Sequence, residues 1–243
     1  MTATIVAVWA LYVFAVHTFA GQRRVATPLV ESKVAPFARG TMEVVWHAYS
    51  WNLLVCAAAI GWHAWAPQPT LVWFVTLQMA GIGAVFLWLG PKRLGSGFGL
   101  PQWVLIGPLV VALALLDAPR LATSLLLLAL AGLHVAWVLG VAWPAPSRRA
   151  MPAYLIGHPE GDGVGRLPTA MVALVLTGLA LAVWLTVPGA RMVVVVVFGA
   201  RGLFGFVERQ LRPETAKTPY AVLSRIFYSP LCLFIAALAF SSR

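Results

Sequence analysis

The fold of this chain is decided by the stretch LATSLLLLALAGLHVAWVLGVAW at residues 121–143, which contains no Asp, Glu, Lys or Arg. A helix needs about 20 mostly apolar residues to cross the hydrocarbon core of a bilayer. Seven further apolar runs lie near residues 3–20, 42–65, 70–90, 101–117, 168–187, 190–208 and 224–240. Strands of a membrane barrel would alternate in polarity, whereas these runs are continuous. The sequence therefore predicts an all-α, polytopic membrane helical bundle with about eight transmembrane helices.

Composition and charge placement define the class of protein. Hydrophobic residues make up 61% of the 243 positions and charged residues only 10%, against about 25% charged residues in soluble domains. The net charge of +10 would suit nucleic acid, but the basic residues follow a different pattern. They gather in every second connection, at 21–41, 91–100, 144–167 and 209–223, which is the positive-inside pattern of a membrane protein. We therefore expect no nucleic-acid partner and a lipid bilayer as the surroundings.

The same pattern predicts an orientation. The four basic connections should lie in the cytoplasm and both termini outside, in a multi-pass protein of the cell membrane. The other connections carry only Arg120 and Arg191 as basic residues. The first apolar run lacks a preceding basic segment, so we expect it to be a retained span and not a cleaved signal.

A weak internal repeat suggests two halves, 1–118 and 119–243. His17 and His134 each come late in a span that precedes a basic connection, and Gly107-Pro108-Leu109 is echoed by Ser229-Pro230-Leu231. Four spans per half is an even number, so the halves would have a parallel orientation, related by an axis along the membrane normal.

Four stretches of the second half carry a family resemblance. They are Leu133-His134-Val135-Ala136-Trp137, His158-Pro159-Glu160-Gly161-Asp162-Gly163, Arg166-Leu167-Pro168-Thr169-Ala170, and Thr218-Pro219-Tyr220 leading into Tyr228-Ser229-Pro230-Leu231-Cys232-Leu233. On these stretches residues 120–243 resemble DUF3995, a family of uncharacterised four-span bacterial membrane proteins. The resemblance implies a four-helix unit and no particular activity. The first half lacks the loop motif.

Polar and ionisable residues inside spans are costly and mark candidate sites. With the predicted orientation, several of them lie at one depth, in the cytoplasmic leaflet. Glu43 and His47 are four residues apart on one helix face, and Arg201 and Glu208 are seven apart. We therefore take Glu43, His47, His134 and Glu208 as candidate catalytic residues, and His17, Trp46, Trp51, Asn52, Trp137 and Arg201 as candidate ligand-binding residues.

Each of these residues also has a purely structural interpretation. The two glutamates could be interfacial charges at helix ends, and Arg201 could simply pair with Glu208. The histidines could satisfy hydrogen bonds inside the bundle. The segment His158–Gly163 could bind a cation or could be a tight turn.

Three functions stay open at this level. The first is an enzyme that acts on a lipophilic, isoprenoid-like substrate by acid–base chemistry, with tryptophans shaping the cavity. The second is a non-catalytic subunit of a membrane complex, with a membrane protein partner, or a small-molecule carrier. The third is haem or metal binding through His17, His47 and His134. No zinc spacing or nucleotide-binding motif is present, and the sequence identifies no cofactor.

Overall fold

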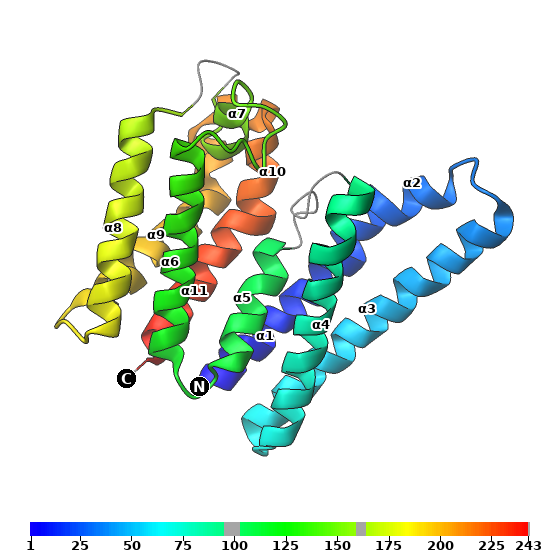
Figure 1. Ribbon diagram of the computed structural model, residues 1–243, viewed down its shortest axis with the longest axis horizontal. Coiled ribbons are helices and arrows are strands. Elements are labelled where there is room, and N and C mark those ends of the chain that lie inside the picture. Colours follow the sequence, from blue (N-terminus) through cyan, green and yellow to red (C-terminus); the bar gives the residue numbers. More distant parts are fainter. Residues whose placement is uncertain (95–102, 159–163, 243) are drawn as a thin grey trace. The chain divides into compact units, whose positions relative to one another are not determined.

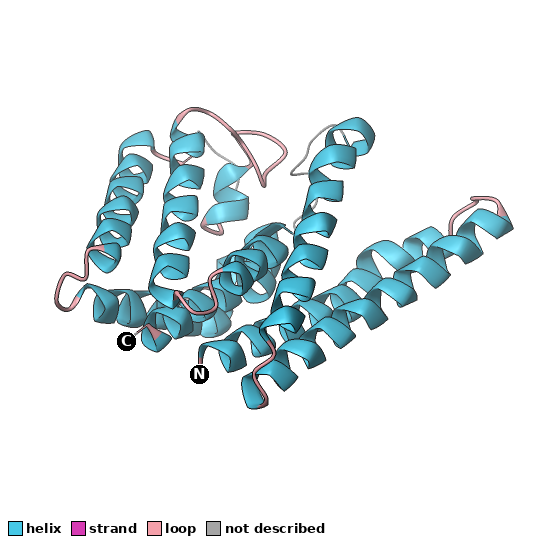
Figure 2. Ribbon diagram, turned by 60° about the horizontal axis from the view of Figure 1, so that its bottom comes forward, coloured by secondary structure: helices cyan, strands magenta, loops and turns pink. Residues whose placement is uncertain are grey.

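A computed structural model of the chain describes residues 1–94, 103–158 and 164–242. Within those ranges every regular element is helical, and no strand occurs (Figure 2). The predicted all-α helical bundle is confirmed.

Seven helices of the described part are long and apolar enough to span a membrane. They are Thr2–Val30, Pro36–Trp65, Pro69–Gly90, Pro119–Val138, Arg166–Trp184, Ala190–Leu211 and Pro219–Ser241. The eighth predicted span corresponds to α5 (Trp103–Ala114), an apolar helix of 12 residues. At 1.5 Å per residue it extends about 18 Å, short of the roughly 30 Å hydrocarbon core. The residues that precede it, 95–102, lie outside the described part.

The chain divides into two compact units, residues 3–79 and 80–243. The boundary falls within helix α4 (Pro69–Leu94). The two halves predicted from the repeat, 1–118 and 119–243, stay a prediction.

The first unit is built on a long helical hairpin. One arm runs without a break through α1 (Thr2–Ala15), the π-helix η1 (Val16–Ala26) and α2 (Thr27–Val30), and the other arm is α3 (Pro36–Trp65). The sequence predicted a connection over 21–41, but only residues 31–35 lie between the arms. Basic residues do not break a helix, whereas Pro36 suits the first position of a new one.

The second unit contains two packed helix pairs. Helix α6 (Pro119–Val138) lies along α8 (Arg166–Trp184), and α9 (Ala190–Leu211) lies along α11 (Ser229–Ser241). Figure 1 shows the second pair crossing the first at an angle, and α11 also contacts α6. Short elements join the long helices at one end, namely α7 (Met151–Leu155), η2 (Pro213–Lys217), α10 (Pro219–Leu223) and the π-helical turn η3 (Ser224–Tyr228).

Helix α6 ends five residues earlier than the apolar run that predicted it. The run extends to residue 143, but the helix stops at Val138. Gly140 adopts a left-handed conformation with φ of 104°, which glycine reaches without steric cost. The indole Nε1 of Trp137 donates a hydrogen bond of 2.6 Å to the carbonyl of Trp143, which holds the returning chain against the helix end.

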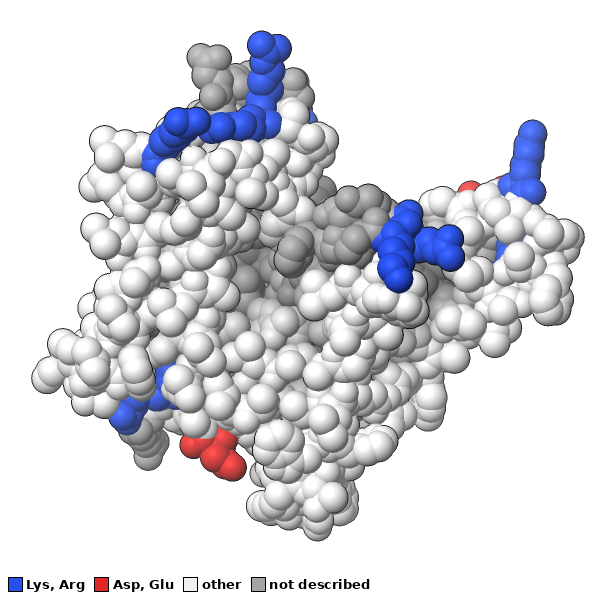
Figure 3. All heavy atoms as spheres, viewed as in Figure 1, with Lys and Arg blue, Asp and Glu red and all other residues white. Residues whose placement is uncertain are grey.

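Charge is distributed along the second unit as a membrane protein requires. On the face shown in Figure 3, Lys and Arg side chains gather at the α7 end, and a smaller group of basic and acidic side chains lies at the opposite end. The surface over α6 and α8 between these two ends is free of charged side chains on that face. Together with the seven apolar helices, this makes the chain an integral membrane protein.

Candidate functional site

Four of the ten predicted site residues belong to two polar groups, one in each unit. The group in the first unit is the N-terminal polar cluster, which we define as His17, Thr18, Gln22, Trp46 and Tyr49. The group in the second unit is the C-terminal polar network, which we define as Arg201, Glu208, Arg212 and Tyr220.

In the N-terminal polar cluster, the imidazole of His17 contacts two aromatic rings of α3. It stacks on Trp46 with ring centroids 4.1 Å apart and meets Tyr49 edge-on at 4.9 Å. Gly21 makes this close approach of η1 and α3 feasible, because a Cβ atom at that position would lie 2.9 Å from the Trp46 ring. Two of the predicted ligand-binding residues, His17 and Trp46, are therefore in direct contact.

The cluster contains a concentration of buried polar atoms that have no partner. Five such atoms lie here: His17 Nε2, Thr18 Oγ1, Gln22 Oε1, Trp46 Nε1 and Tyr49 Oη. Elsewhere in the described part of the chain only Ser124 and Arg201 contribute such an atom. A buried polar group without a hydrogen bond costs about 1–3 kcal/mol, so five in one place demand an explanation. Three of them lie on a π-helix, a rare conformation that is frequent at functional sites.

The remaining predicted residues of the first unit lie outside this cluster. Glu43 and His47 are exposed on α3, and neither forms a hydrogen bond or an ion pair within the described residues. The side chain of Trp51 is 67% exposed. Asn52 accepts a hydrogen bond from Gln78 of α4, and Gln78 in turn accepts one from Cys56. Asn52 therefore has a partner within the fold.

In the C-terminal polar network, Tyr220 joins the two predicted ionic residues of α9. Its hydroxyl donates a hydrogen bond of 2.6 Å to Glu208 Oε2 and accepts one of 2.8 Å from Arg201 Nη2. The carboxylate of Glu208 is only 5% exposed, and Arg212 forms a 2.8 Å ion pair with its other oxygen. Buried charges persist when they are paired and hydrogen-bonded in this way.

Two glycines on the buried face of α9 bring this network against α11. A Cβ atom at Gly202 would lie 2.7 Å from carbons of Leu233, and one at Gly205 would overlap Ser229 Oγ. Small residues allow helix backbones to approach closely in membranes. Arg201 lies beside this contact, and its Nη1 is buried without a partner.

His134 and Trp137 lie together near the end of α6. Their rings meet edge-on at 4.6 Å, and His134 Nδ1 lies 2.8 Å from the carbonyl oxygen of Leu130. Among the described residues, no hydrogen bond or ion pair links His134 to Arg201 or Glu208. The histidine therefore has a structural partner within its own helix.

No group of three or more His, Cys, Asp or Glu side chains that could hold a metal ion occurs among the described residues. Cys56 and Cys232 are both free thiols. Of the loop His158–Gly163, only His158 belongs to the described part, so the predicted turn or cation site lies outside it.

Sequence reasoning missed several members of these groups. Tyr220 lies 12 residues after Glu208 and is brought back by the η2 turn, a separation that no helical periodicity predicts. Thr18, Gln22 and Tyr49 are uncharged, so a search for ionisable residues passes over them. The Thr218-Pro219-Tyr220 motif was the available signal for Tyr220, since it is part of the family resemblance.

Comparison with known proteins agrees with that resemblance for one segment. Residues 127–239 match a family model described as "Protein of unknown function (DUF3995)". The matched segment runs from within α6 to within α11, so it includes the C-terminal polar network and not the N-terminal polar cluster. No curated protein and no solved structure matches the chain. The family description assigns no activity.

Proposed function

We propose that this integral membrane protein binds a lipophilic small molecule that carries an uncharged polar head, and that the N-terminal polar cluster holds that head. The observation that carries the proposal is the convergence of five buried, unpartnered polar atoms between η1 and α3. A ligand that hydrogen-bonds to several of them would remove the cost of their burial.

The chemistry of the cluster defines the class of ligand. Trp46 and Tyr49 offer hydrogen-bond donors, Gln22 offers an acceptor, and the Thr18 hydroxyl and His17 imidazole can serve in either role. No carboxylate, lysine or arginine belongs to the cluster, which favours a hydroxyl or carbonyl over a charged group. The helices around it are apolar, so an aliphatic chain attached to that head would be compatible with its surroundings.

A binding or carrier role is better supported than acid–base catalysis. Glu43 and His47, two of the four candidate catalytic residues, are exposed on α3 and form no hydrogen bond or ion pair within the described residues. Glu208 already accepts hydrogen bonds from Tyr220 and Arg212. Among the described residues, no group of three or more His, Cys, Asp or Glu side chains supports a metal site.

The proposal is tested with the full chain purified from native membranes. Bound small molecules are extracted and identified by mass spectrometry, and binding of farnesol, an isoprenoid chain with one hydroxyl, is measured in detergent micelles. The variants Trp46→Phe and Tyr49→Phe each remove one donor and keep the aromatic ring. We expect each to weaken retention of the extracted molecule about tenfold, as the loss of one hydrogen bond predicts. Trp51→Phe, on the exposed face of the same helix, is the matched control.

The same variants distinguish a cluster that holds a ligand from one that is empty. If nothing occupies the cluster, removing an unpartnered Trp46 N–H or Tyr49 O–H leaves stability unchanged or raises it. A purified protein that carries no small molecule, together with such neutral or stabilising variants, would refute the proposal. Lower stability in both variants without an extractable molecule would indicate bound water in place of a ligand, and would also overturn it.

A further inference from the structure

We propose that the ligand of the N-terminal polar cluster is a lipophilic alcohol, and that its hydroxyl both donates and accepts a hydrogen bond in the site. The inference rests on the proposed function and narrows the uncharged polar head to one chemical group. Two unpartnered atoms whose hydrogen-bonding roles are fixed carry it, namely Trp46 Nε1 and Gln22 Oε1.

These two atoms need opposite partners. An indole N–H can only donate, and an amide oxygen can only accept. A ketone, ester or ether head would pair with Trp46 and leave Gln22 Oε1 buried without a hydrogen bond, which weakens binding. A hydroxyl has one donor and two acceptor lone pairs, so it can serve both atoms at once. It is the smallest uncharged group that does so.

The fold brings the two side chains to neighbouring positions. A Cβ atom on Gly21 would lie 2.9 Å from Trp46 Cζ2, a ring carbon on the same side of the indole as Nε1. Gln22 is the next residue along the chain, and its Oε1 is buried. The edge of the indole that carries the N–H therefore lies against the part of η1 that carries the amide.

The stacked rings of the cluster leave each other's nitrogens unpaired. His17 and Trp46 stack with an interplanar angle of 21°. The N–H groups and lone pairs of such rings lie in the ring plane, so two stacked rings direct them sideways and not at each other. No hydrogen bond reaches any of the cluster's five unpartnered atoms from another described residue. These atoms are therefore left for a molecule that enters the cluster.

The π-helical conformation of η1 determines which of its side chains share a face. Its backbone hydrogen bonds join residues five apart, as the bond from the Thr27 N–H to the Gln22 carbonyl does. His17 and Gln22 are also five apart, so one turn of η1 places them on the same face. In an α-helix of 3.6 residues per turn they would be about 140° apart. The rare helix type thus sets the acceptor of Gln22 beside the donors of α3.

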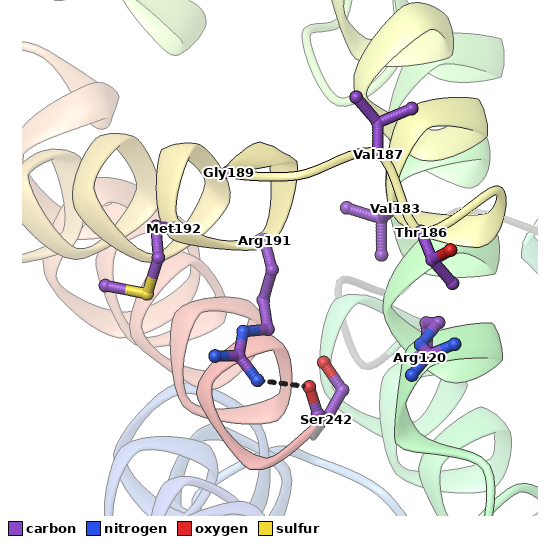
Figure 4. Close-up of a pocket in the computed structure, with 8 residues that line it drawn as sticks. All are labelled: Arg120, Val183, Thr186, Val187, Gly189, Arg191, Met192 and Ser242. Carbon is purple, nitrogen blue, oxygen red and sulfur yellow. Dashed lines mark hydrogen bonds between the residues drawn. The ribbon is translucent and has the colours of Figure 1, made fainter.

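A pocket in the second unit offers no comparable set of groups. It has a volume of about 230 Å³ between α6, α8, α9 and the end of α11, and Arg120 and Arg191 belong to its lining (Figure 4). Arg191 Nη1 donates a hydrogen bond of 2.6 Å to the Ser242 carbonyl, and Ser242 Oγ donates one of 2.7 Å to the Ala239 carbonyl. Arg120 also has an interaction partner. None of the lining residues contributes a buried side-chain atom without a partner.

The test compares two ligands that differ only at the hydroxyl hydrogen. Farnesol and farnesyl methyl ether share the chain and the acceptor oxygen, but only farnesol can donate. Their affinities for the full chain are measured in detergent micelles at equal mole fractions of ligand. Farnesol should bind about tenfold more tightly, as one additional hydrogen bond predicts. This comparison uses the unaltered protein, so it does not depend on the folding of any variant.

Two variants assign the individual hydrogen bonds. Gln22→Met removes the acceptor at nearly constant side-chain length. It should weaken farnesol binding about tenfold, leave ether binding unchanged, and so abolish the preference. Trp46→Phe should weaken both ligands alike, because both oxygens accept from the indole N–H. Gln68→Met, the same substitution at an exposed glutamine of the first unit, is the matched control and should change neither affinity.

The outcomes distinguish failure of this inference from failure of the proposed function. If neither ligand binds and no small molecule is extracted from the purified protein, the proposed function fails and the inference fails with it. If the extracted molecule lacks a hydroxyl, or if both ligands bind the unaltered protein equally, the proposed function stands and the inference is overturned. An equal loss of both ligands in Gln22→Met, or a loss of the preference in Gln68→Met, would overturn it as well.

Discussion

Removing the hydroxyl of Tyr220 should destabilise the second unit substantially, because it breaks two hydrogen bonds to ionic partners. The variant Tyr220→Phe keeps the ring and its packing. It removes the donor to Glu208 Oε2 at 2.6 Å and the acceptor for Arg201 Nη2 at 2.8 Å. Both partners are ionic and held within the bundle, and Arg201 already has one unpartnered nitrogen.

The magnitude follows from the two bonds lost. Hydrogen bonds to charged groups contribute about 1.5–3 kcal/mol each in soluble proteins, and interhelical bonds in membranes average nearer 0.6 and reach about 1.7 kcal/mol. Glu208 keeps its ion pair with Arg212, which limits the loss. We therefore expect the free energy of unfolding to fall by about 2–4 kcal/mol.

Tyr228→Phe is the matched control. Its hydroxyl makes one longer bond of 3.3 Å, to the uncharged carbonyl of Tyr154, so the expected loss is below about 1 kcal/mol. Both variants are measured by reversible unfolding in mixed micelles with increasing dodecyl sulfate. Adding Glu208→Gln to Tyr220→Phe should cost less than it does alone, because the two residues are coupled. A Tyr220→Phe loss no larger than that of Tyr228→Phe would refute the network's role.

Two further predictions concern packing and orientation. Gly205→Ala should weaken the α9–α11 contact by about 1–3 kcal/mol in the same assay, because its Cβ atom would overlap Ser229. Gly199→Ala, with open space around it, should leave stability unchanged or raise it by up to about 1 kcal/mol. Equal effects of the two variants would contradict the packing argument. In a cysteine-free background, Ser147→Cys should react with an impermeant maleimide only in inverted vesicles and Gln68→Cys only in intact cells. The reverse labelling would show that the predicted orientation is wrong.

Periodicity and length predicted most of the helical architecture. Apolar runs located every one of the seven long helices, because the bilayer demands about 20 apolar residues and satisfied backbone groups in each. Helix ends were less predictable. Hydropathy continues past Val138 into residues 139–143, but the backbone turns at Gly140, and nothing in an apolar run marks that turn except the glycine itself.

The candidate sites were predicted in part. The sequence selected His17 and Trp46 separately, and the fold stacks them; it selected Arg201 and Glu208 as a pair, and the fold inserts Tyr220 between them. The grouping of all six ionisable candidates into one site stays a prediction, since they are divided between the two units. The sequence does not mark an uncharged residue such as Gln22 as a site residue, because its polar group destabilises the protein only when it is buried without a hydrogen bond.

The sequence by itself determined that this is a helical membrane protein, because hydrophobicity and the placement of charge act locally along the chain. The pattern of basic connections also singled out Arg120 and Arg191 as exceptions. Only the tertiary structure decided that these two line one pocket and that five unpartnered polar atoms converge between η1 and α3. The physical reason is that hydrogen-bond satisfaction and cavity lining depend on which helices pack together, and apolar helices of similar composition do not specify their neighbours in sequence.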